Sequence, residues 1–262
     1  MDTALITGAS GGIGFELAGV MAREGYNLVL AARNEKELMR LKNELESRYG
    51  VSVRIFAKDL SVIDPVYEIF NALKSEGIII DVLVNNAGFG DYGPFIKSDP
   101  DTDLRMIGLN VTTLVLLTRL FAEDMAKRRH GRILNVASTA AFQPGPLMAV
   151  YYASKAFVLS FSEAIANELK DKNVTVTALC PGPTVSGFQK AAHLEGTRLF
   201  KERKLPDSKE VAEFGYNAMM KGKTVAIHGI LNSFVANVVR FFPRNLVTSA
   251  TRSIQEKTKK EV

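Results

Sequence analysis

The sequence is poor in the residues that build disulfide frameworks and metal centres. Its 262 residues include one cysteine, Cys180, three histidines and no tryptophan. A single cysteine excludes an intramolecular disulfide and is typical of a reducing compartment. Cys180 follows a β-rich run and precedes Pro181, so we expect it to end a buried strand as a packed, inert thiol. The histidines are far apart in the sequence and show no ligand spacing, so we expect no metal.

Long apolar runs and clustered charge are also scarce. The first apolar run, Ala4–Ile6, is short and leads straight into glycines. We therefore see no secretory signal, and no stretch looks long enough to span a membrane. The net charge of +5 comes from scattered basic residues, whereas a nucleic-acid partner favours clustered ones. We expect a cytoplasmic protein without a nucleic-acid partner. The basic cluster Lys257–Lys260 is interpreted as a frayed terminus, with weak attraction to an anionic membrane as the alternative.

Short β-rich runs alternate with longer amphipathic runs along the chain. At this length, and with 47% hydrophobic residues, the chain can bury a substantial core. The alternation predicts an α/β fold, a Rossmann-like, doubly wound parallel sheet of about seven strands with helices on both faces. The predicted strands are Thr3–Thr7, Asn27–Ala32, Ser52–Ala57, Asp81–Asn85, Arg132–Ala137, Val174–Cys180 and Thr224–His228. The predicted helices are Gly12–Arg23, Glu35–Tyr49, Pro65–Ser75, Asp101–Arg128, Val150–Lys170 and Ser208–Lys221.

Residues 1–262 are predicted to form a single domain with two irregular parts. Residues 184–205 follow the sixth strand, where a substrate lid would lie. Residues 229–262 form a C-terminal extension, in which Ser233–Phe242 predicts an amphipathic helix broken near Pro243. We favour packing of this helix against the body or a subunit. The alternative is an element for a membrane surface or a hydrophobic substrate.

A glycine-rich turn follows the first predicted strand. Gly8, Gly12 and Gly14 have the spacing G-x-x-x-G-x-G, and a predicted helix follows. Glycine permits a tight turn and lets the backbone approach a ligand closely. The helix N-terminus offers free N–H groups and a positive dipole end to a pyrophosphate. The turn alone is weak evidence, but its place between a strand and a helix predicts a dinucleotide site.

A tyrosine and a lysine lie four residues apart in a later predicted helix. This spacing stacks the side chains of Tyr151 and Lys155 on one face. A phenol has a free pKa of about 10, and a neighbouring ammonium would favour the phenolate and lower that pKa. Such a proton donor beside a dinucleotide site predicts hydride transfer to or from a carbonyl. Tyr152, three residues from Lys155, competes for this role on helical geometry alone.

These features resemble the motifs of the short-chain dehydrogenase/reductase family, and the resemblance covers nearly the whole chain. Its members have the same glycine spacing, and further matches follow in order. They are Asp59-Leu60 beside the adenine, Asn85-Asn86-Ala87-Gly88 after the fourth strand, Asn110 in a helix, Ser138, Tyr151 and Lys155 as catalytic residues, and Pro181-Gly182 after the sixth strand. Each residue taken singly has an ordinary structural explanation. Together they favour the functional interpretation.

The resemblance implies a role for each catalytic residue. Tyr151 would protonate the alkoxide that forms when the nicotinamide delivers hydride to a carbonyl carbon, and Ser138 would hold the same oxygen. Lys155 would lower the pKa of Tyr151 and bind the nicotinamide ribose. Asn110 would position a water that links Lys155 to solvent. The family spacing favours Tyr151 over Tyr152. The predicted cofactor contacts are Gly8, Ser10, Gly12, Ile13, Gly14, Arg33, Asp59, Leu60, Asn86, Ala87, Gly88, Tyr151, Lys155, Pro181, Gly182 and Thr184.

The end of the second predicted strand favours NADP(H) over NAD(H). An NAD site usually has an acid there, which accepts hydrogen bonds from the ribose 2′-OH. Ala31 and Ala32 offer no such group, whereas the Arg33 guanidinium suits a 2′-phosphate and Ser10 would add a hydrogen bond. Glu35 is expected to serve the dipole of the next helix. The alternative is that Arg33 only stacks on the adenine and leaves the selectivity mixed.

Apolar side chains are predicted around the nicotinamide and indicate a hydrophobic pocket. They are Phe89, Tyr92, Phe95, Phe142, Leu147 and Met148, with Phe188, Leu194, Leu199 and Phe200 from the lid. We expect an NADP(H)-dependent oxidoreductase that reduces an apolar ketone or aldehyde to an alcohol, or catalyses the reverse. Two alternatives stay open: a non-catalytic NADP(H)-binding sensor, and a membrane-surface protein that acts through its tail. The resemblance also implies a homo-oligomer, a dimer or a tetramer.

Overall fold

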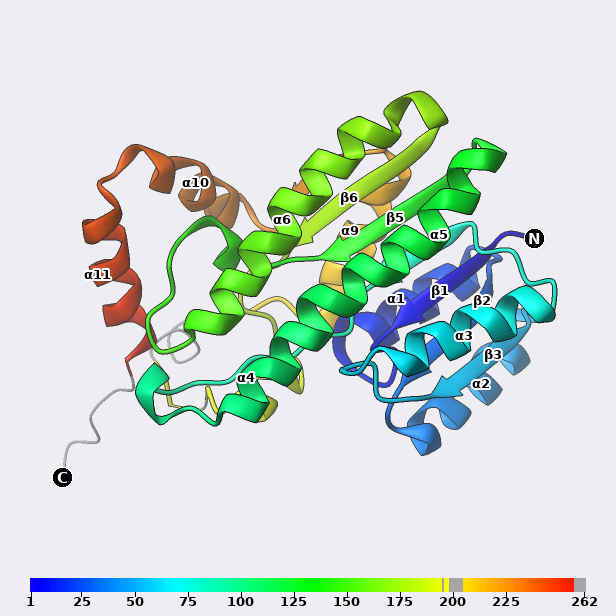
Figure 1. Ribbon diagram of the computed structural model, residues 1–262, viewed down its shortest axis with the longest axis horizontal. Helices are drawn as coiled ribbons and strands as arrows, with labels where there is room; N and C mark the ends of the chain where they lie inside the picture. The colour runs from blue at the N-terminus through cyan, green and yellow to red at the C-terminus, as the bar shows by residue number, and fades with distance from the viewer. Residues whose placement is uncertain (195, 198–204, 257–262) are drawn as a thin grey trace.

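A single parallel sheet forms the centre of the molecule (Figure 1). The structure, a computed structural model, describes residues 1–194, 196–197 and 205–256. Within them the strand order is β3-β2-β1-β4-β5-β6-β7. The strands are β1 (Thr3–Thr7), β2 (Asn27–Ala32), β3 (Val53–Ala57), β4 (Val82–Asn85), β5 (Gly131–Val136), β6 (Val174–Cys180) and β7 (Val225–Ile227). The order reverses between β1 and β4, which is where ligands bind in doubly wound sheets, beyond the carboxyl ends of the strands.

Helices cover both faces of the sheet. One layer holds α1 (Gly12–Arg23), α2 (Glu35–Tyr49) and α9 (Ser208–Met220), and the other holds α3 (Asp64–Ser75), α5 (Leu114–Arg128) and α6 (Ala149–Leu169). Successive β1 residues point to opposite layers: Ile6 packs in the first core and Leu5 in the second, both fully buried. Burial on both faces explains why the strands are continuous apolar runs. The predicted fold is confirmed.

One predicted helix, Asp101–Arg128, is interrupted in the structure. It consists of α4 (Pro100–Ile107), the π-helical segment η2 (Gly108–Thr113) and α5. The backbone of Gly108 lies so close to the Ser61 carbonyl that a side chain there would clash with it. Thr113 anchors the other end of η2 by donating its hydroxyl hydrogen to the Leu60 carbonyl. These contacts with the loop after β3 accompany the widened turn, which carries Asn110.

The same stretch corrects the prediction about membrane spans. Pro100–Arg128 has 29 residues and contains an 18-residue window with a mean hydropathy of 1.4, so by length and composition alone it could cross a membrane. In this fold, however, Leu117, Phe121 and Met125 are buried and pack with the core between α5 and the sheet. Core packing therefore explains part of the apolar character of this stretch, of which the apolar window is 39% buried.

The C-terminal extension forms two helices, α10 (Ile230–Val238) and α11 (Arg244–Gln255), joined by the 3-10 turn η5 (Val239–Phe241). The predicted break near Pro243 is confirmed, because Pro243 directly precedes α11. Figure 1 shows both helices beyond the carboxyl ends of the strands, on the side away from the N-terminus. In the predicted lid the structure describes a short helix, α7 (Phe188–Ala191). Residues 195 and 198–204 of the predicted lid lie outside the described part.

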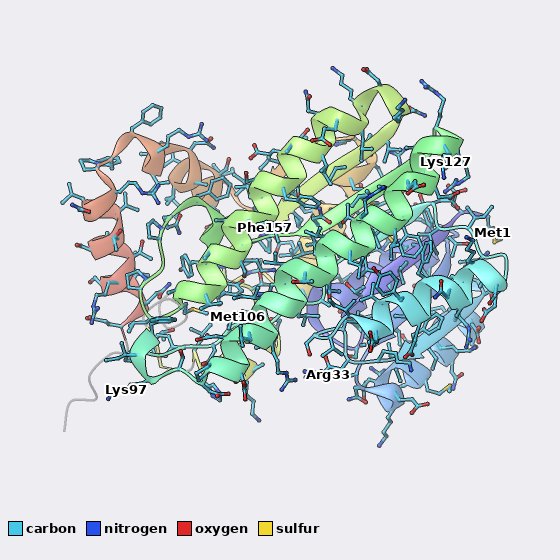
Figure 2. The ribbon with its side chains drawn as sticks, viewed as in Figure 1. Met1, Arg33, Lys97, Met106, Lys127 and Phe157 are labelled. Atoms are coloured by element: carbon cyan, nitrogen blue, oxygen red, sulfur yellow. The ribbon has the colours of Figure 1, made fainter. Side chains whose placement is uncertain are left out.

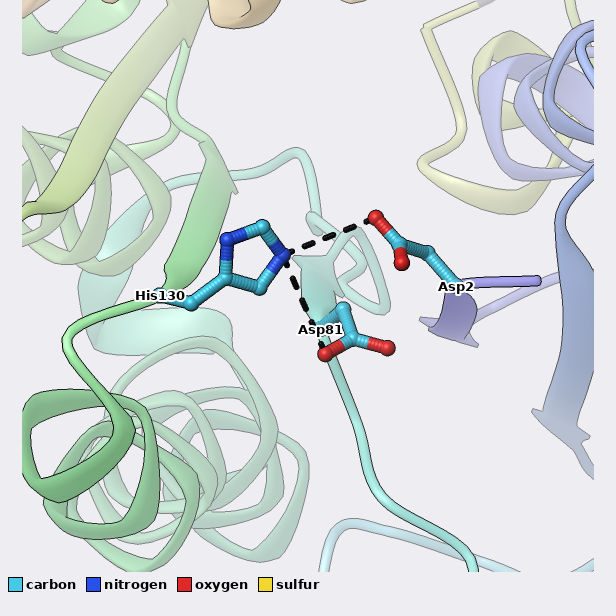
Figure 3. A group of neighbouring side chains, drawn as sticks. All are labelled: Asp2, Asp81 and His130. Atoms are coloured by element: carbon cyan, nitrogen blue, oxygen red, sulfur yellow. Dashed lines mark ion pairs between the residues drawn. The ribbon is translucent and has the colours of Figure 1, made fainter.

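A small charged group lies at the amino ends of β1, β4 and β5 (Figure 3). His130 Nε2 lies 3.6 Å from Asp2 Oδ2 and 4.0 Å from Asp81 Oδ1, so a histidine does meet two acids that linear spacing did not reveal. However, Asp81 Oδ1 also lies 3.0 Å from Arg128 Nη1, and Asp81 Oδ2 accepts a hydrogen bond from the Thr3 amide. Arg128 already supplies Asp81 with the positive charge that a metal ion would bring. We interpret the group as a set of ion pairs that connects the starts of β1, β4 and β5.

Candidate active site

The glycine turn lies at the carboxyl end of β1 and is held by the end of β4. Gly8 and Gly12 have positive φ angles of 69° and 56°, which favour glycine. Gly14 has no room for a side chain, since a Cβ would clash with the Gly8 carbonyl and with Asn86. Asn86 Nδ2 donates to the carbonyl oxygens of Thr7 and Gly8 at 2.9 and 3.2 Å. Asn86, which follows β4, therefore holds the glycine turn in place where the strand order reverses.

The start of α1 has the features of an anion site. Gly11, at the N-cap, provides no side-chain cap, and Gly11, Gly12 and Ile13 line a cavity. The unpaired N–H groups of the first turn and the positive end of the helix dipole suit a pyrophosphate. The backbone geometry thus fits the phosphate end of a dinucleotide.

This cavity has a volume of about 1600 Å³ and runs from the glycine turn to the C-terminal extension. Small-molecule sites usually measure about 300–1,000 Å³, so this one has room for a dinucleotide and a substrate together. Of the residues predicted to contact the cofactor, all but Gly14 line it. They are Gly8, Ser10, Gly12, Ile13, Arg33, Asp59, Leu60, Asn86, Ala87, Gly88, Tyr151, Lys155, Pro181, Gly182 and Thr184.

At the adenine end, charged groups gather after β2 and β3. Arg33 is exposed, lines the cavity and forms no hydrogen bond within the described residues (Figure 2). Burial raises the pKa of Asp59, but hydrogen bonds from Ser61 and the charges of Arg33 and Arg105 outweigh this, so the pKa is lowered overall. Asp59 Oδ2 lies 3.4 Å from Arg105 Nη2. The carboxylate therefore stays ionised while the Arg33 guanidinium is open to an anionic group.

Tyr151 lies in the first turn of α6, between two other aromatic rings. Its ring centroid is 6.0 Å from that of Tyr152 and 5.4 Å from that of Phe188. Tyr151 and Ser138 both line the cavity. Ser138 follows β5, and its Oγ accepts a hydrogen bond from the Ala140 amide at 3.1 Å. Two hydroxyl groups from separate elements thus face the same space.

Lys155 lies one turn further along α6 and is buried, at 6% exposure. Its Nζ donates to the Val136 carbonyl at 2.8 Å and lies 5.8 Å from the Tyr151 ring centroid. Burial lowers the pKa of Lys155 to about 8, although Cys180 opposes this slightly. The thiol of Cys180 is itself buried at the end of β6, which confirms the predicted packing, and burial raises its pKa to about 12.

The expected lowering of the Tyr151 pKa is wrong for this arrangement. Burial raises the pKa of Tyr151 well above its usual value, the Ser138 hydroxyl lowers it in part, and Tyr152 raises it further. The ammonium of Lys155 is directed at a carbonyl rather than at the phenol oxygen. Tyr151 is therefore a neutral phenol here, the form that can donate a proton.

Asn110 lies in η2 and is 1% exposed. Its Nδ2 donates to the Phe89 carbonyl at 2.9 Å and to Ser154 Oγ at 3.0 Å, and its Oδ1 accepts from the Phe89 amide at 3.1 Å. A side chain at Gly88 would meet both Asn110 Oδ1 and Lys155 Nζ, so these groups converge there. Asn110 does not line the cavity itself, and the water relay stays a prediction. Ser154 was missed, since nothing in its local sequence marks it as a partner of Asn110.

The apolar wall differs in part from the prediction. Phe89, Met148, Phe188 and Leu194 line the cavity, whereas Tyr92, Phe95, Phe142 and Leu147 do not. The Tyr92 hydroxyl donates to the Gln255 carbonyl, Phe95 is 66% exposed and Phe142 packs against the core beneath α6. Leu199 and Phe200 lie outside the described residues. The extension supplies much of the wall instead, with Phe234, Val235, Val238, Val239, Phe242, Leu246, Val247, Ile254 and Gln255.

Known proteins resemble this chain in both sequence and structure. The sequence model for short chain dehydrogenase matches residues 2–195. The 17-beta-hydroxysteroid dehydrogenase type 3 of Mus musculus is 37% identical over 182 residues, which cover 68% of this chain and 58% of that protein. The very-long-chain 3-oxoacyl-CoA reductase of Mus musculus is 30% identical over 252 residues, 93% of this chain and 76% of that protein.

Two solved structures show the same architecture. A short-chain dehydrogenase from Sphingobium yanoikuyae in complex with NADPH has a TM-score of 0.83 and 29% identity, covering 92% of this chain and 94% of that one. The bulky-bulky ketone specific alcohol dehydrogenase from Comamonas testosteroni has a TM-score of 0.78 and 30% identity, covering 92% of both chains. The matched region contains the glycine turn, Ser138, Tyr151 and Lys155. The chain therefore belongs to the short-chain dehydrogenase/reductase family.

Proposed function

We propose that this protein is an NADP(H)-dependent reductase that converts an apolar ketone or aldehyde to an alcohol, or catalyses the reverse reaction. The observation that carries the proposal is one shared cavity. The glycine turn and α1 N-terminus form one end of it, and the Tyr151 and Ser138 hydroxyl groups lie further along the same space. A dinucleotide at the glycine turn and a substrate beside Tyr151 would therefore share one cavity.

Each polar group at the reaction centre has a separate task. A bound nicotinamide would supply hydride to the carbonyl carbon. Tyr151, neutral and buried, donates its proton to the oxygen that becomes negative. Ser138 donates a hydrogen bond to that oxygen and orients it. Lys155, with a pKa near 8, can hold or release a proton at working pH and so restore the proton of Tyr151 through a water held near Asn110.

The proposed cofactor preference depends on Arg33. The exposed guanidinium follows β2 and lies over the cavity, where a 2′-phosphate would accept charge-assisted hydrogen bonds. Neighbouring Ala31 and Ala32 line the cavity without offering an acceptor to a ribose hydroxyl. The NADPH in the structure from Sphingobium yanoikuyae agrees with this preference.

The proposed substrate is bulky and apolar. Phe89, Met148 and Phe188 line the cavity on one side, and aliphatic and phenyl side chains of α10 and α11 line it on the other. The names of similar proteins include a hydroxysteroid, a very-long-chain 3-oxoacyl-CoA and a bulky ketone. The test is a panel of carbonyl compounds followed by NADPH absorbance, with NADH in parallel. Turnover of small charged acids, and of no bulky ketone, would contradict the proposal.

Exposed apolar side chains of the extension support a proposed location. Ile230, Phe241 and Leu246 are 92%, 81% and 62% exposed, and of these three Phe241 does not line the cavity. Residues 229–255 contain three arginines and no acidic residue. Exposed apolar side chains beside basic ones suit the surface of an anionic membrane. We propose a cytoplasmic protein that contacts such membranes peripherally through α10 and α11.

Vesicle co-sedimentation tests this location. The variant Phe241→Ser should lose most binding to anionic vesicles and keep its activity on soluble ketones, because Phe241 is 81% exposed on the turn between the helices and does not line the cavity. The matched control is Ile79→Ser, since Ile79 is exposed near the amino end of β4, away from the extension. Equal binding of both variants would contradict the proposal. Loss of a dimer in light scattering, without vesicle binding by the unsubstituted protein, would assign this face to a homo-oligomer instead.

A further inference from the structure

The last residue of α11 brings an unpaired amide to the wall of the cavity. Gln255 is 1% exposed and lines the cavity. Neither its Oε1 nor its Nε2 has a hydrogen-bond partner among the described residues. Buried polar side-chain atoms in native proteins nearly always have a partner, which is the protein, a water or a ligand. A buried amide with both ends open is therefore a candidate ligand contact.

The backbone around Gln255 is firmly placed. Its carbonyl accepts a hydrogen bond from the Tyr92 hydroxyl at 3.0 Å, and the Glu256 amide closes the helix onto the Arg252 carbonyl at 3.0 Å. Thr251, one turn earlier, is also buried and donates its hydroxyl hydrogen to the Val247 carbonyl at 2.9 Å. The Tyr92 bond connects the helix end to the body and the other two bonds stabilise the helix itself, so the side chain at 255 is held at the cavity by the fold.

Of the other polar side chains that the extension offers to the cavity, two are already bonded within the protein and the third, Ser253, is exposed. Thr251 is bonded to Val247, and Asn232 Nδ2 donates to the His228 carbonyl at 2.8 Å. Around Gln255 the wall is mostly apolar, with Val247 and Ile254 among its members. Gln255 therefore differs from its neighbours in having its polar atoms uncommitted.

Tyr152 gives the amide a second polar neighbour. Burial raises the pKa of Tyr152, and the nearby Gln255 amide lowers it in part, so the two side chains are close without a well-formed hydrogen bond between them. Tyr152 also lines the cavity, and its ring lies 6.0 Å from that of Tyr151. Gln255 and Tyr152 are therefore separated from the proton donor Tyr151 by about the width of one aromatic ring.

We propose that Gln255, assisted by Tyr152, binds a second oxygen of the substrate, remote from the carbonyl that reacts. This inference rests on the proposed function, and it narrows the substrate to an apolar compound with two separated oxygen functions. An amide can donate to a carbonyl and accept from a hydroxyl, and it carries no charge to balance a carboxylate. Burying a carboxylate beside it would be costly. The second function is therefore neutral, a ketone or a hydroxyl.

The test uses pairs of substrates that differ only in the distal oxygen. One pair is 2-undecanone and 2,10-undecanedione, and the other is a saturated steroid monoketone and its diketone. The unsubstituted protein should prefer the diketone by roughly 10–100-fold in kcat/KM, as expected for a buried group left unpaired by the analogue. In Gln255→Leu this preference should vanish, because the diketone loses its distal contact. Thr251→Val is the matched control and should keep the preference.

A binding measurement separates this inference from the proposed function. Calorimetry of both ketones against the NADPH-loaded protein reports the distal contact without any turnover. A diketone preference that Gln255→Leu retains would overturn the Gln255 assignment, whereas absence of turnover on every carbonyl would overturn the proposed function. Thermal unfolding of the ligand-free protein checks folding: Gln255→Leu should melt about 2–4 °C higher, because it removes an unpaired buried amide. Should this variant fail to fold, the shorter Gln255→Asn should weaken the preference in the same direction.

Discussion

The two ends of the cavity differ in how their amide side chains are paired. At the proposed cofactor end, Arg33 is open, but two asparagines beside the cavity are bonded to the protein itself: Asn86 to the Thr7 and Gly8 carbonyls, and Asn110 to Phe89 and Ser154. At the substrate end, the wall comes from α10 and α11, which are largely exposed, and its amide at Gln255 is unpaired. The comparison indicates that the dinucleotide half is preformed, whereas the ligand completes the other half.

The boundary between the two halves lies at the adjacent tyrosines of α6. Tyr151→Phe should lower kcat by about 10²–10⁴-fold, because it removes the proton donor while keeping the ring packed against Phe188. NADPH binding, measured by fluorescence, should survive. Tyr152→Phe is the matched control and should keep most of kcat with the monoketone. The reverse pattern in the two variants would move the reaction centre to Tyr152 and break the proposed boundary.

A change at Arg33 sharpens the comparison, because it should affect the cofactor half alone. Arg33→Ala should reduce kcat/KM for NADPH by roughly 10–100-fold, the value of one or two charge-assisted hydrogen bonds. The kcat/KM for NADH and the KM for the ketone should change less than threefold. Lys36→Ala, on the exposed start of α2, is the control for general charge loss. An equal loss with both cofactors would show that Arg33 stacks on the adenine without reading the 2′ position.

Lys155 gives an effect of a different kind, on the stability of the cofactor-free protein. Its folded pKa of about 8 lies below the ordinary 10.5, so the buried charge destabilises the fold below pH 8. Between those two values the unfolded state binds more protons, and stability rises with pH. Lys155→Met should therefore be more stable than the unsubstituted protein by up to about 3 kcal/mol near pH 7, and by less near pH 9.5.

Urea unfolding at the two pH values provides this measurement. The exposed Lys172 offers the control, since Lys172→Met should show no pH-dependent difference. A stability gain for Lys155→Met that grows toward pH 9.5 would contradict the burial of a charged lysine at this position.

Much of the fold and of the cofactor half could be predicted because both follow from local sequence. The β-rich and amphipathic runs predicted most strands and helices within one or two residues of those observed. The exceptions are the interrupted helix predicted over Asp101–Arg128 and the helix predicted over Ser233–Phe242, which is observed over Ile230–Val238. Gly8, Gly12 and Gly14 marked the turn by their order alone. Backbone requirements of this kind are visible in a linear pattern, since they concern neighbours in the chain.

The substrate half could not be predicted in the same way, because it depends on distant contacts. Nothing local to Gln255 shows that it lies at the cavity, 104 residues after Tyr151. The wide turn at Asn110 depends on the approach of Gly108 to Ser61, and the raised pKa of Tyr151 depends on burial by several elements. Each of these is a property of the packed molecule rather than of a segment.

The most direct test of the account is a crystal structure with NADP⁺ and an unreactive ketone analogue bound together. We predict that the pyrophosphate lies at the start of α1 and that the nicotinamide C4 lies about 3–3.5 Å from the carbonyl carbon. The carbonyl oxygen should lie about 2.6–3.2 Å from Tyr151 Oη. A nicotinamide ring held well away from Tyr151, with the carbonyl oxygen bonded to another group, would contradict the proposed reaction centre.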